Sequence, residues 1–385
     1  MSSSLRAFGF ITVLIAGSGA WFTASPQAAT PPASVNITSF GAKGDGVTDD
    51  TEAMKAALRA TAPQGTLICP GSSVYIITTV TVPSQITISG TCTIKQKDHT
   101  ADRALLNIPN GSAGITIDGI TIDGNRPNVS GNNANGIFVS NTSNITIKNV
   151  KFINIRRNGV LIAGGKGFTL ANLTGANFGV AADHAIGSLV QAWQGASDLN
   201  MSNLHMETFY GIGLNITKVH NITLRDSNLS GSTMSSGMTI EGSTGVVLHN
   251  VTASNNFAHG FELTGDDGLQ ADTLVAEKNQ AYNYLIGVFS EGNIPGRDYH
   301  ITNLVSSGAG KQGVMIQGLI GADFRDWNVS DGITMLRDDR TQTRPSNIAW
   351  TDCTIDRVTL EHADNIRFNR KPGQISTVDS HPVIK

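Results

Sequence analysis

A short pattern that recurs about every 23 residues limits how this chain can fold more than any other feature of it. In each copy an apolar residue is followed by any residue, then by Asn, Asp or Gly, and usually by a second apolar residue. Copies begin at Ile117, Ile147, Leu170, Met201, Leu224, Leu248, Ala271, Ile301, Phe324 and Trp350. They start 30, 23, 31, 23, 24, 23, 30, 23 and 26 residues apart, so the base period is 23 with occasional insertions. A fixed period of this length is typical of a solenoid, in which each repeat forms one coil.

A second pattern, of glycine, apolar, any and apolar residues, alternates with the first. It occurs at 136–139, 159–162, 211–214, 237–240, 260–263 and 313–316. Each period therefore holds at least two short strands of alternating polarity, separated by tight turns. Helical solenoids are excluded because no segment between repeats has a 3.6-residue periodicity, and the fixed leucine spacing of leucine-rich repeats is absent. The sequence predicts an all-β chain folded as a single-stranded parallel β-helix, with its recurring asparagines stacked in internal ladders.

The open ends of such a solenoid need covering, and the sequence offers a cap at its start. Asp49 followed by Glu52 is a capping-box arrangement, which predicts a short helix over residues 50–60. We expect one β-helix domain over residues 30–385, with the N-terminal cap at about 35–62. The residues after Arg370 are polar and predict an irregular tail over about 370–385.

The first 29 residues have the layout of a secretory signal peptide: Arg6, a short apolar run, then small residues. Cleavage is expected between Ala20 and Ala29, which predicts a secreted or periplasmic protein without stable membrane insertion. Export makes disulfides possible, and Cys69 and Cys92 lie one period apart, either paired or as stacked thiols. Cys353 is left over and expected to be buried. A net charge of −3 and a pI of about 6.3 give no basis for a nucleic-acid partner.

The residues that open the repeat region resemble a known family. The stretch 35–53, VNITSFGAKGDGVTDDTEA, resembles the entry motif of the pectate-lyase-like superfamily, in the branch of rhamnogalacturonases, mannuronan epimerases and phage tailspikes. The segment from Cys69 to Tyr75 resembles the Pro-x-Gly-x-Tyr segment of that branch. The resemblance implies a right-handed parallel β-helix. It does not specify the reaction, because the branch includes hydrolases, lyases, epimerases and binding spikes.

Candidate catalytic residues lie just before the repeat glycines, where we expect side chains from successive coils to form one column. Action on a uronate needs a group that neutralises the carboxylate, together with a base and an acid. The candidates are Arg157 to neutralise, Tyr210 as acid or base, His259 or His184 as its partner, and Asp183 to orient His184. Candidates for substrate binding are Asn158, Asn215, Glu241, Glu262, Tyr284 and Lys311. Each of these also fits a structural role in a turn or on a strand.

The preferred hypothesis is a lyase or epimerase that acts on a uronate-containing polysaccharide. This polysaccharide is the expected partner. Residues 210–215 resemble the catalytic coil of mannuronan epimerases, because Tyr210 matches the tyrosine of that coil. The family's Asp-Pro-His is replaced here by Gly213, Leu214 and Asn215. A glycoside hydrolase is the first alternative; Asp266 and Asp267 resemble a polygalacturonase motif, but their position predicts turn residues. A non-catalytic carbohydrate-binding surface β-helix is the second. No cofactor is required and no metal ligands are assigned, although many pectate lyases use Ca²⁺.

Overall fold

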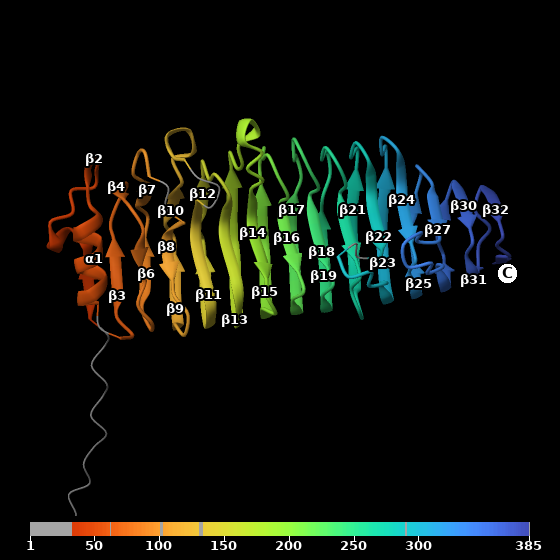
Figure 1. Cartoon of the computed structure of the whole chain (residues 1–385), viewed down its shortest axis with the longest axis horizontal. Coiled ribbons are helices and arrows are strands. Elements are labelled where there is room, and N and C mark those ends of the chain that lie inside the picture. The colour runs from red at the N-terminus through yellow and green to blue at the C-terminus, as the bar shows by residue number, and fades with distance from the viewer. Residues whose placement is uncertain (1–32, 62, 101–102, 131–133, 289–290, 385) are drawn as a thin grey trace, which may run out of the picture. The chain divides into compact units, whose positions relative to one another are not determined.

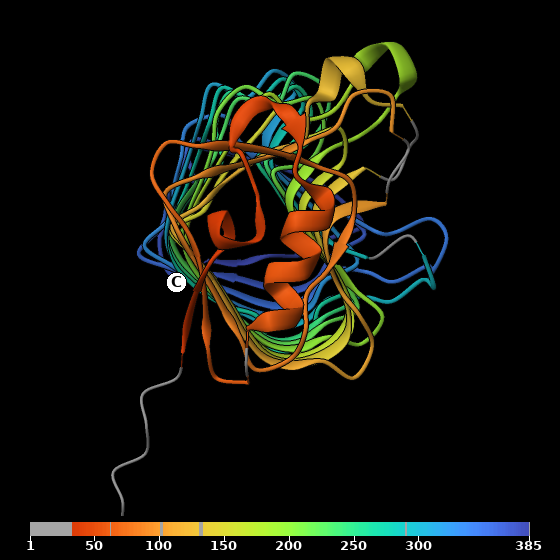
Figure 2. The same cartoon turned by 90° about the vertical axis from the view of Figure 1, so that its left-hand side faces the viewer.

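The computed structural model describes residues 33–384, apart from 62, 101–102, 131–133 and 289–290. The expected signal peptide lies outside these residues. The described chain belongs to one compact unit that begins at Pro32, and its coils stack along a single axis. Figure 1 shows this stack from the side, and Figure 2 shows it end-on, with successive coils superimposed.

The described strands form three parallel sheets that run along the stack, as the strand pairings show. Sheet 1 contains β1 (Ser34–Asn36), β3 (Thr66–Cys69), β6 (Thr87–Gly90), β9 (Ala113–Asp118), most of β11 (Asn135–Lys148) and β13 (Asn158–Ala176), β15 (Ser197–Met206), β17 (His220–Leu229), β19 (Thr244–Thr252), β21 (Gln270–Glu277), β23 (Arg297–Ser307), β25 (Ile320–Arg325), β28 (Ser346–Thr351), β31 (Asp364–Phe368) and β33 (Val383–Ile384). Sheet 2 contains β2 (Asp45–Asp49), β4 (Val74–Ile77), β7 (Thr93–Gln96), β10 (Thr121–Asp123), β12 (Lys151–Ile153), the ends of the long sheet 1 strands, β26 (Asn328–Val329) and β29 (Thr354–Ile355).

Sheet 3 is the sheet that carries the candidate site. It contains β5 (Val80–Thr81), β8 (Ala104–Ile108), the first parts of β11 and β13, β14 (Ser188–Trp193), β16 (Leu214–Thr217), β18 (Met238–Glu241), β20 (Phe261–Thr264), β22 (Tyr282–Gly287), β24 (Gln312–Gln317), β27 (Ile333–Leu336), β30 (Arg357–Glu361) and β32 (Gln374–Val378). Three short 3₁₀ turns cover Ile37–Phe40, Arg126–Asn128 and Ala181–Asp183. The tail expected to be irregular contains two strands, β32 and β33, which pair in parallel with β30 and β31.

The strand register confirms the first repeat at every copy. Ile147 pairs with Ile117 on the coil before it and with Leu170 on the coil after it, and the pairing continues in this way to Trp350. All ten positions are buried in the interior. The insertions that lengthen the period therefore lie in turns and leave the core register unchanged.

The second repeat is displaced by two residues on one coil. Leu214 pairs with Val190 and Met238, so the repeat glycine there is Gly213 and not Gly211. A glycine is needed at this position because a Cβ atom on Gly213 would lie 2.5 Å from the carbonyl oxygen of Gly237. The same crowding recurs on a later coil, where a Cβ on Gly260 would lie 2.6 Å from the carbonyl oxygen of Ala253.

The recurring asparagines form a ladder, as expected, but it lies on the surface. The amide of Asn172 donates to the side-chain oxygen of Asn149 at 2.8 Å, and Asn203 donates to Asn172 at 2.9 Å. All three are exposed and have φ between 51° and 55°. Asparagine adopts this left-handed conformation more readily than other residues with a Cβ, which explains its recurrence at the turn. A second, buried ladder connects Asn256, Asn279 and Asn283 in a different turn.

The N-terminal helix α1 (Thr51–Ala60) covers the first coil with Met54, Ala57 and Leu58. The expected capping box does not form. Asp50 is the N-cap residue, but its carboxylate accepts hydrogen bonds from the backbone N–H groups of Lys43 and Gly44, at 2.7 and 3.0 Å. The Asp50 carboxylate therefore holds the preceding glycine-rich loop and does not cap the helix with a side-chain hydrogen bond.

Cys69 and Cys92 form a disulfide between adjacent coils, with their Cα atoms 5.6 Å apart, and Cys353 is a buried free thiol. We expect Cys69→Ser together with Cys92→Ser to lower the free energy of unfolding by about 3 kcal/mol, since the bond closes a loop of 23 residues. Urea unfolding with and without reductant measures this. Cys353→Ala is the matched control, and its midpoint should not depend on reductant. An unchanged wild-type midpoint after reduction would contradict the expectation.

Candidate active site on sheet 3

Two glutamates face outward from adjacent strands of sheet 3. Glu241 on β18 pairs with Thr264, and Glu262 on β20 pairs with Thr239, so the two glutamates are diagonal neighbours. Sheet spacing puts their Cα atoms roughly 8 Å apart. Both contribute to one hollow of about 100 Å³, which is also lined by Thr264, Leu285, Ile286, Val288, Gln317 and Arg340. The structure thus brings two carboxyl groups, both named from the sequence as substrate-binding candidates, into one site.

The two carboxyl groups hold protons differently. Burial and the negative charges of Glu262 and Glu291 raise the pKa of Glu241 to about 7. Burial also raises the pKa of Glu262, while hydroxyl donors at 3.4 Å, from Ser236 and Thr239, oppose the rise. The charge of Glu262 is one cause of the raised pKa of Glu241, so the pair holds a proton to higher pH than two separate carboxyl groups would.

His259 and Tyr282 lie at the edge of the same sheet, one coil apart. Their rings stack with centroids 5.2 Å apart, and the Lys311 ammonium lies 5.8 Å from the centre of the Tyr282 ring. Burial and the positive charge of Lys311 lower the pKa of His259 to about 4. The imidazole is therefore neutral at physiological pH and can accept a proton.

Lys311→Met should raise the pKa of His259 from about 4 toward its ordinary value of 6.5, because one of the two causes of the depression is removed. NMR titration of the histidine ring protons measures the shift. Lys278→Met, which removes an exposed lysine from a neighbouring turn, is the control and should leave His259 unchanged. Equal titration curves for wild-type and Lys311→Met would show that burial alone sets the pKa.

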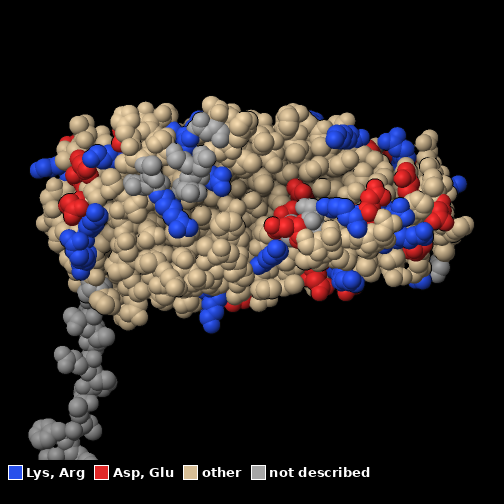
Figure 3. All heavy atoms as spheres, viewed as in Figure 1, with Lys and Arg blue, Asp and Glu red and all other residues tan. Residues whose placement is uncertain are grey.

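Basic groups lie beside the carboxyl pair. The Lys218 ammonium is 3.4 Å from the Glu291 carboxylate, and Arg340 contributes to the hollow from the loop after β27. Figure 3 shows acidic side chains gathered at a hollow in the middle of this face, with basic side chains next to them. Sequence reasoning missed Arg340, Gln317 and Glu291. Gln317 could have been found from strand alternation, whereas Arg340 and Glu291 lie in insertions that no repeat describes.

The other catalytic candidates lie elsewhere. Tyr210 precedes the displaced Gly211, so it lies in a turn and lines a hollow with Arg126, Arg156 and Thr233. The sheet 3 register instead aligns Ile212 with Ser236 and His259. His184 is exposed in the insertion between β13 and β14, where the side chain of Asp183 lies outside the described part. Arg157 is half-buried at the start of β13. The structure therefore does not bring Tyr210, His184 or Arg157 to the carboxyl pair.

The substrate-binding candidates also differ from one another. Asn215 faces outward from β16, and Lys311 is exposed. Asn158 is 2% exposed, and its amide donates to the side-chain oxygens of Asn135 and Gln191 at 2.9 and 3.0 Å. Tyr284 is a correction: it is fully buried, stacks on Phe261 in the core and donates its hydroxyl to a backbone carbonyl, so it cannot contact a sugar. Tyr282 is the accessible tyrosine of that strand.

Asp266 lies in a turn, as expected, but it is fully buried. Its carboxyl accepts a hydrogen bond from the backbone N–H of Ser243 at 2.8 Å and lies 3.4 Å from the Tyr299 hydroxyl. Burial raises the pKa of Asp266 well above its usual range. Because Ser243 is two residues after Glu241, Asp266 fixes the turn that follows the strand carrying that glutamate.

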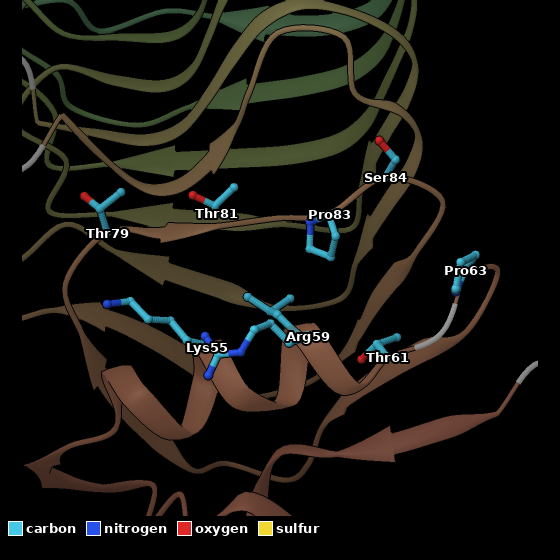
Figure 4. A pocket seen from close by; sticks show the side chains of 9 residues that line it. Lys55, Arg59, Thr61, Pro63, Thr79, Thr81, Pro83 and Ser84 are labelled. Atoms are coloured by element: carbon cyan, nitrogen blue, oxygen red, sulfur yellow. The ribbon is translucent and has the colours of Figure 1, made fainter.

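A larger hollow of about 750 Å³ lies between α1 and the first coils (Figure 4). Lys55 and Arg59 line it from the helix, opposite Thr79 and Thr81, and Lys55 pairs with Glu52 at 2.9 Å. The residues that line this hollow are far in sequence from Glu241 and Glu262. Among the described residues, no group of three or more His, Cys, Asp or Glu side chains is arranged to hold a metal ion, and no described helix is long and apolar enough to cross a membrane.

Comparison with known families supports the same architecture. The family model for the right-handed β-helix region matches residues 104–274, and the model for the pectate-lyase-like rhamnogalacturonase A/epimerase family matches residues 34–90. At residues 34–90 the chain is thus similar to the pectate-lyase-like branch that the sequence motif resembles. The chain is a right-handed parallel β-helix with an N-terminal capping helix, as the sequence predicts.

Solved structures with the same fold are distant in sequence. The surface adhesin PfbA of Streptococcus pneumoniae is 14% identical with a TM-score of 0.52, covering 91% of this chain and 88% of the adhesin. Gene product 12 of bacteriophage phi29 is 16% identical with a TM-score of 0.50, covering 90% and 52%. A mannuronan C-5 epimerase A-module of Azotobacter vinelandii is 15% identical with a TM-score of 0.45, covering 90% and 99%. These likenesses concern the fold alone. No curated protein sequence matches the chain.

Proposed function

We propose that this chain is a glycoside hydrolase that cleaves a polysaccharide across the outer face of sheet 3. The observation that carries the proposal is the diagonal pair of Glu241 and Glu262 in one hollow, of which Glu241 keeps its proton to about pH 7. Glycoside hydrolysis requires this combination, one protonated and one ionised carboxyl group flanking the scissile bond.

In this proposal Glu241 is the general acid and gives its proton to the leaving glycosidic oxygen. Glu262 is the ionised partner, which either activates a water molecule or attacks the sugar carbon directly. The hydroxyls of Ser236 and Thr239 orient its carboxylate. Arg340 lines the same hollow, and its guanidinium is paired with the Asp338 carboxylate at 3.3 Å.

A second candidate, the lyase or epimerase reaction on a uronate, is favoured by the neutral His259 stacked on Tyr282. His259 would abstract the proton next to the uronate carboxylate, Tyr282 would supply a proton, and Lys311 would neutralise the acid. This places the chemistry at the edge of sheet 3 rather than at the carboxyl pair.

Incubation with polygalacturonate, rhamnogalacturonan and alginate separates these reactions. New reducing ends without an unsaturated-uronate absorbance support the hydrolase. Absorbance supports the lyase, and a change in sugar stereochemistry by NMR without cleavage supports the epimerase. Binding without any chemical change would overturn both and leave a carbohydrate-binding protein. The assays are run with Ca²⁺ and with a chelator, since the superfamily resemblance allows for calcium.

We also propose that the protein acts outside the cytoplasm, because its first 29 residues have the layout of a signal peptide. N-terminal sequencing of the protein recovered outside the cytoplasm tests this. A new N-terminus between Ala20 and Ala29 is expected, whereas protein found only in the cytoplasm with an intact Met1 would contradict the proposal.

A further inference from the structure

An exposed tryptophan lies on the same face as the carboxyl pair. Trp193 ends β14, and its side chain is 39% exposed, whereas Trp327 and Trp350 are 1% and 2% exposed. Alternation along β14 explains the direction, since Val190 and Ala192 are in the core and Trp193 points to the outside. An indole with this much of its surface in water, on the strand face that carries the carboxyl pair, is available to contact a ligand through its ring.

Trp193 and Glu241 belong to one column that runs parallel to the solenoid axis. Ala192 pairs with Ile216, so Trp193 follows in register with Thr217, and Thr217 pairs with Glu241. Two coil steps separate Trp193 from Glu241, about 10 Å at sheet spacing. On its other side Trp193 pairs with Ala163, which is 6% exposed.

The neighbouring column has the polar groups that a sugar needs. Gln191 and Asn215 face outward next to Trp193, and Asn215 pairs with Thr239, which contacts Glu262. The buried amide of Asn158 donates to the Gln191 side-chain oxygen at 3.0 Å and holds that side chain in position. An aromatic surface beside fixed amides matches a pyranose ring, which has an apolar face and a hydroxylated rim.

We infer that Trp193 is a stacking platform for a sugar unit of the polysaccharide, bound on the N-terminal side of the reaction centre. The polymer lies along the solenoid axis and reaches Glu241 two coils later. The inference rests on the proposed function for its occupant, because the platform is continuous with the carboxyl pair. It predicts that long chains gain affinity from Trp193, while oligosaccharides too short to reach it do not.

Tryptophan fluorescence tests this without turnover. Trp21 belongs to the segment expected to be removed on export, and the other described tryptophans are buried, so acrylamide quenching in the exported protein reports on Trp193. Using Glu241→Gln protein, we expect one of polygalacturonate, rhamnogalacturonan and alginate to protect the exposed indole from quenching. In the same background, Trp193→Ala should weaken polymer binding about tenfold or more, and Trp193→Tyr should restore most of it. Phe257→Ala, which removes a 51% exposed aromatic side chain from a turn, is the matched control.

The outcomes separate this inference from the proposed function. If a polymer is hydrolysed but neither protects Trp193 nor binds more weakly to Trp193→Ala, the inference that Trp193 stacks on a sugar is wrong. The proposed hydrolase function is then retained. If a polymer protects Trp193 and is not cleaved by wild-type protein, the platform stands and the hydrolase fails. If no polymer in the panel protects the indole, the inference is overturned. A loss in Trp193→Ala that Phe257→Ala reproduces would also overturn it.

Discussion

Glu241→Gln and Glu262→Gln should each lower the turnover of the cleaved polymer by about 10²–10⁴-fold. Each removes one half of the acid–base pair while keeping the size of the side chain. Initial rates of reducing-end release measure the loss. Glu361→Gln is the matched control, because Glu361 faces outward from the same sheet at its exposed C-terminal end. Activity within about twofold of wild type in both variants would exclude the carboxyl pair as the reaction centre.

The same pair predicts how activity depends on pH. The proton on Glu241 is lost as the pH rises through about 7, so turnover should decline above neutrality. It should also decline in acid, where Glu262 gains its proton. A rate that stays constant from pH 6 to about 9 would contradict the assignment of Glu241 as the acid.

The stability of the folded protein should also depend on the protonation of Glu241. The pKa of Glu241 is about 7 in the folded protein and near 4.5 when unfolded, so wild-type protein loses stability as the pH rises between these values. Because the carboxyl is only partly buried, we expect Glu241→Gln to gain about 1 kcal/mol over wild type at pH 8 and little at pH 4. Urea unfolding at the two pH values measures the difference.

Trp350→Ala should lower the free energy of unfolding by about 3–5 kcal/mol, the largest effect on stability expected from a single substitution discussed for this chain. The Trp350 ring lies 4.7 Å from Phe324, 4.9 Å from Trp327 and 5.9 Å from Phe368, between ring centroids. This aromatic group fills the C-terminal coils. Truncation leaves a large cavity there, because the surrounding backbone is held by strand pairs on both sides.

Trp350→Phe is the conservative comparison. The Trp350 indole N–H has no hydrogen-bond partner among the described residues, so phenylalanine loses volume but no hydrogen bond, and about 1–2 kcal/mol is expected. By contrast, the Trp327 N–H donates to the Ile301 carbonyl at 3.0 Å. Urea unfolding compares the variants. A cost for Trp350→Ala no greater than that for Trp350→Phe would mean that the C-terminal coils close around the cavity.

Much of the candidate site could be anticipated one strand at a time. The alternation of β18 and β20 predicts that Glu241 and Glu262 face outward, and His259 and Lys311 were named from their position before a glycine. Their meeting depends on the pairing of coils, which local sequence does not report when the period varies. On the coil with Gly211 and Gly213, both glycines fit the same pattern. Local sequence therefore predicts Tyr210 in the column, whereas the strand pairing places Ile212 there.

The sequence by itself determined the core, the direction of each strand and the position of the cap. These follow from a two-residue alternation and a 23-residue period, both of which are local and repeated many times. Only the tertiary structure decided which outward side chains share a surface. Insertions in the turns bring Arg340 and Glu291 to the carboxyl pair, whereas the strand pairing puts Tyr284 in the core beside Phe261 and aligns Trp193 with Glu241 through Thr217. The reason is physical: a column across sheet 3 joins residues that are 17 to 31 positions apart on successive coils, so its membership depends on the length of every turn between them.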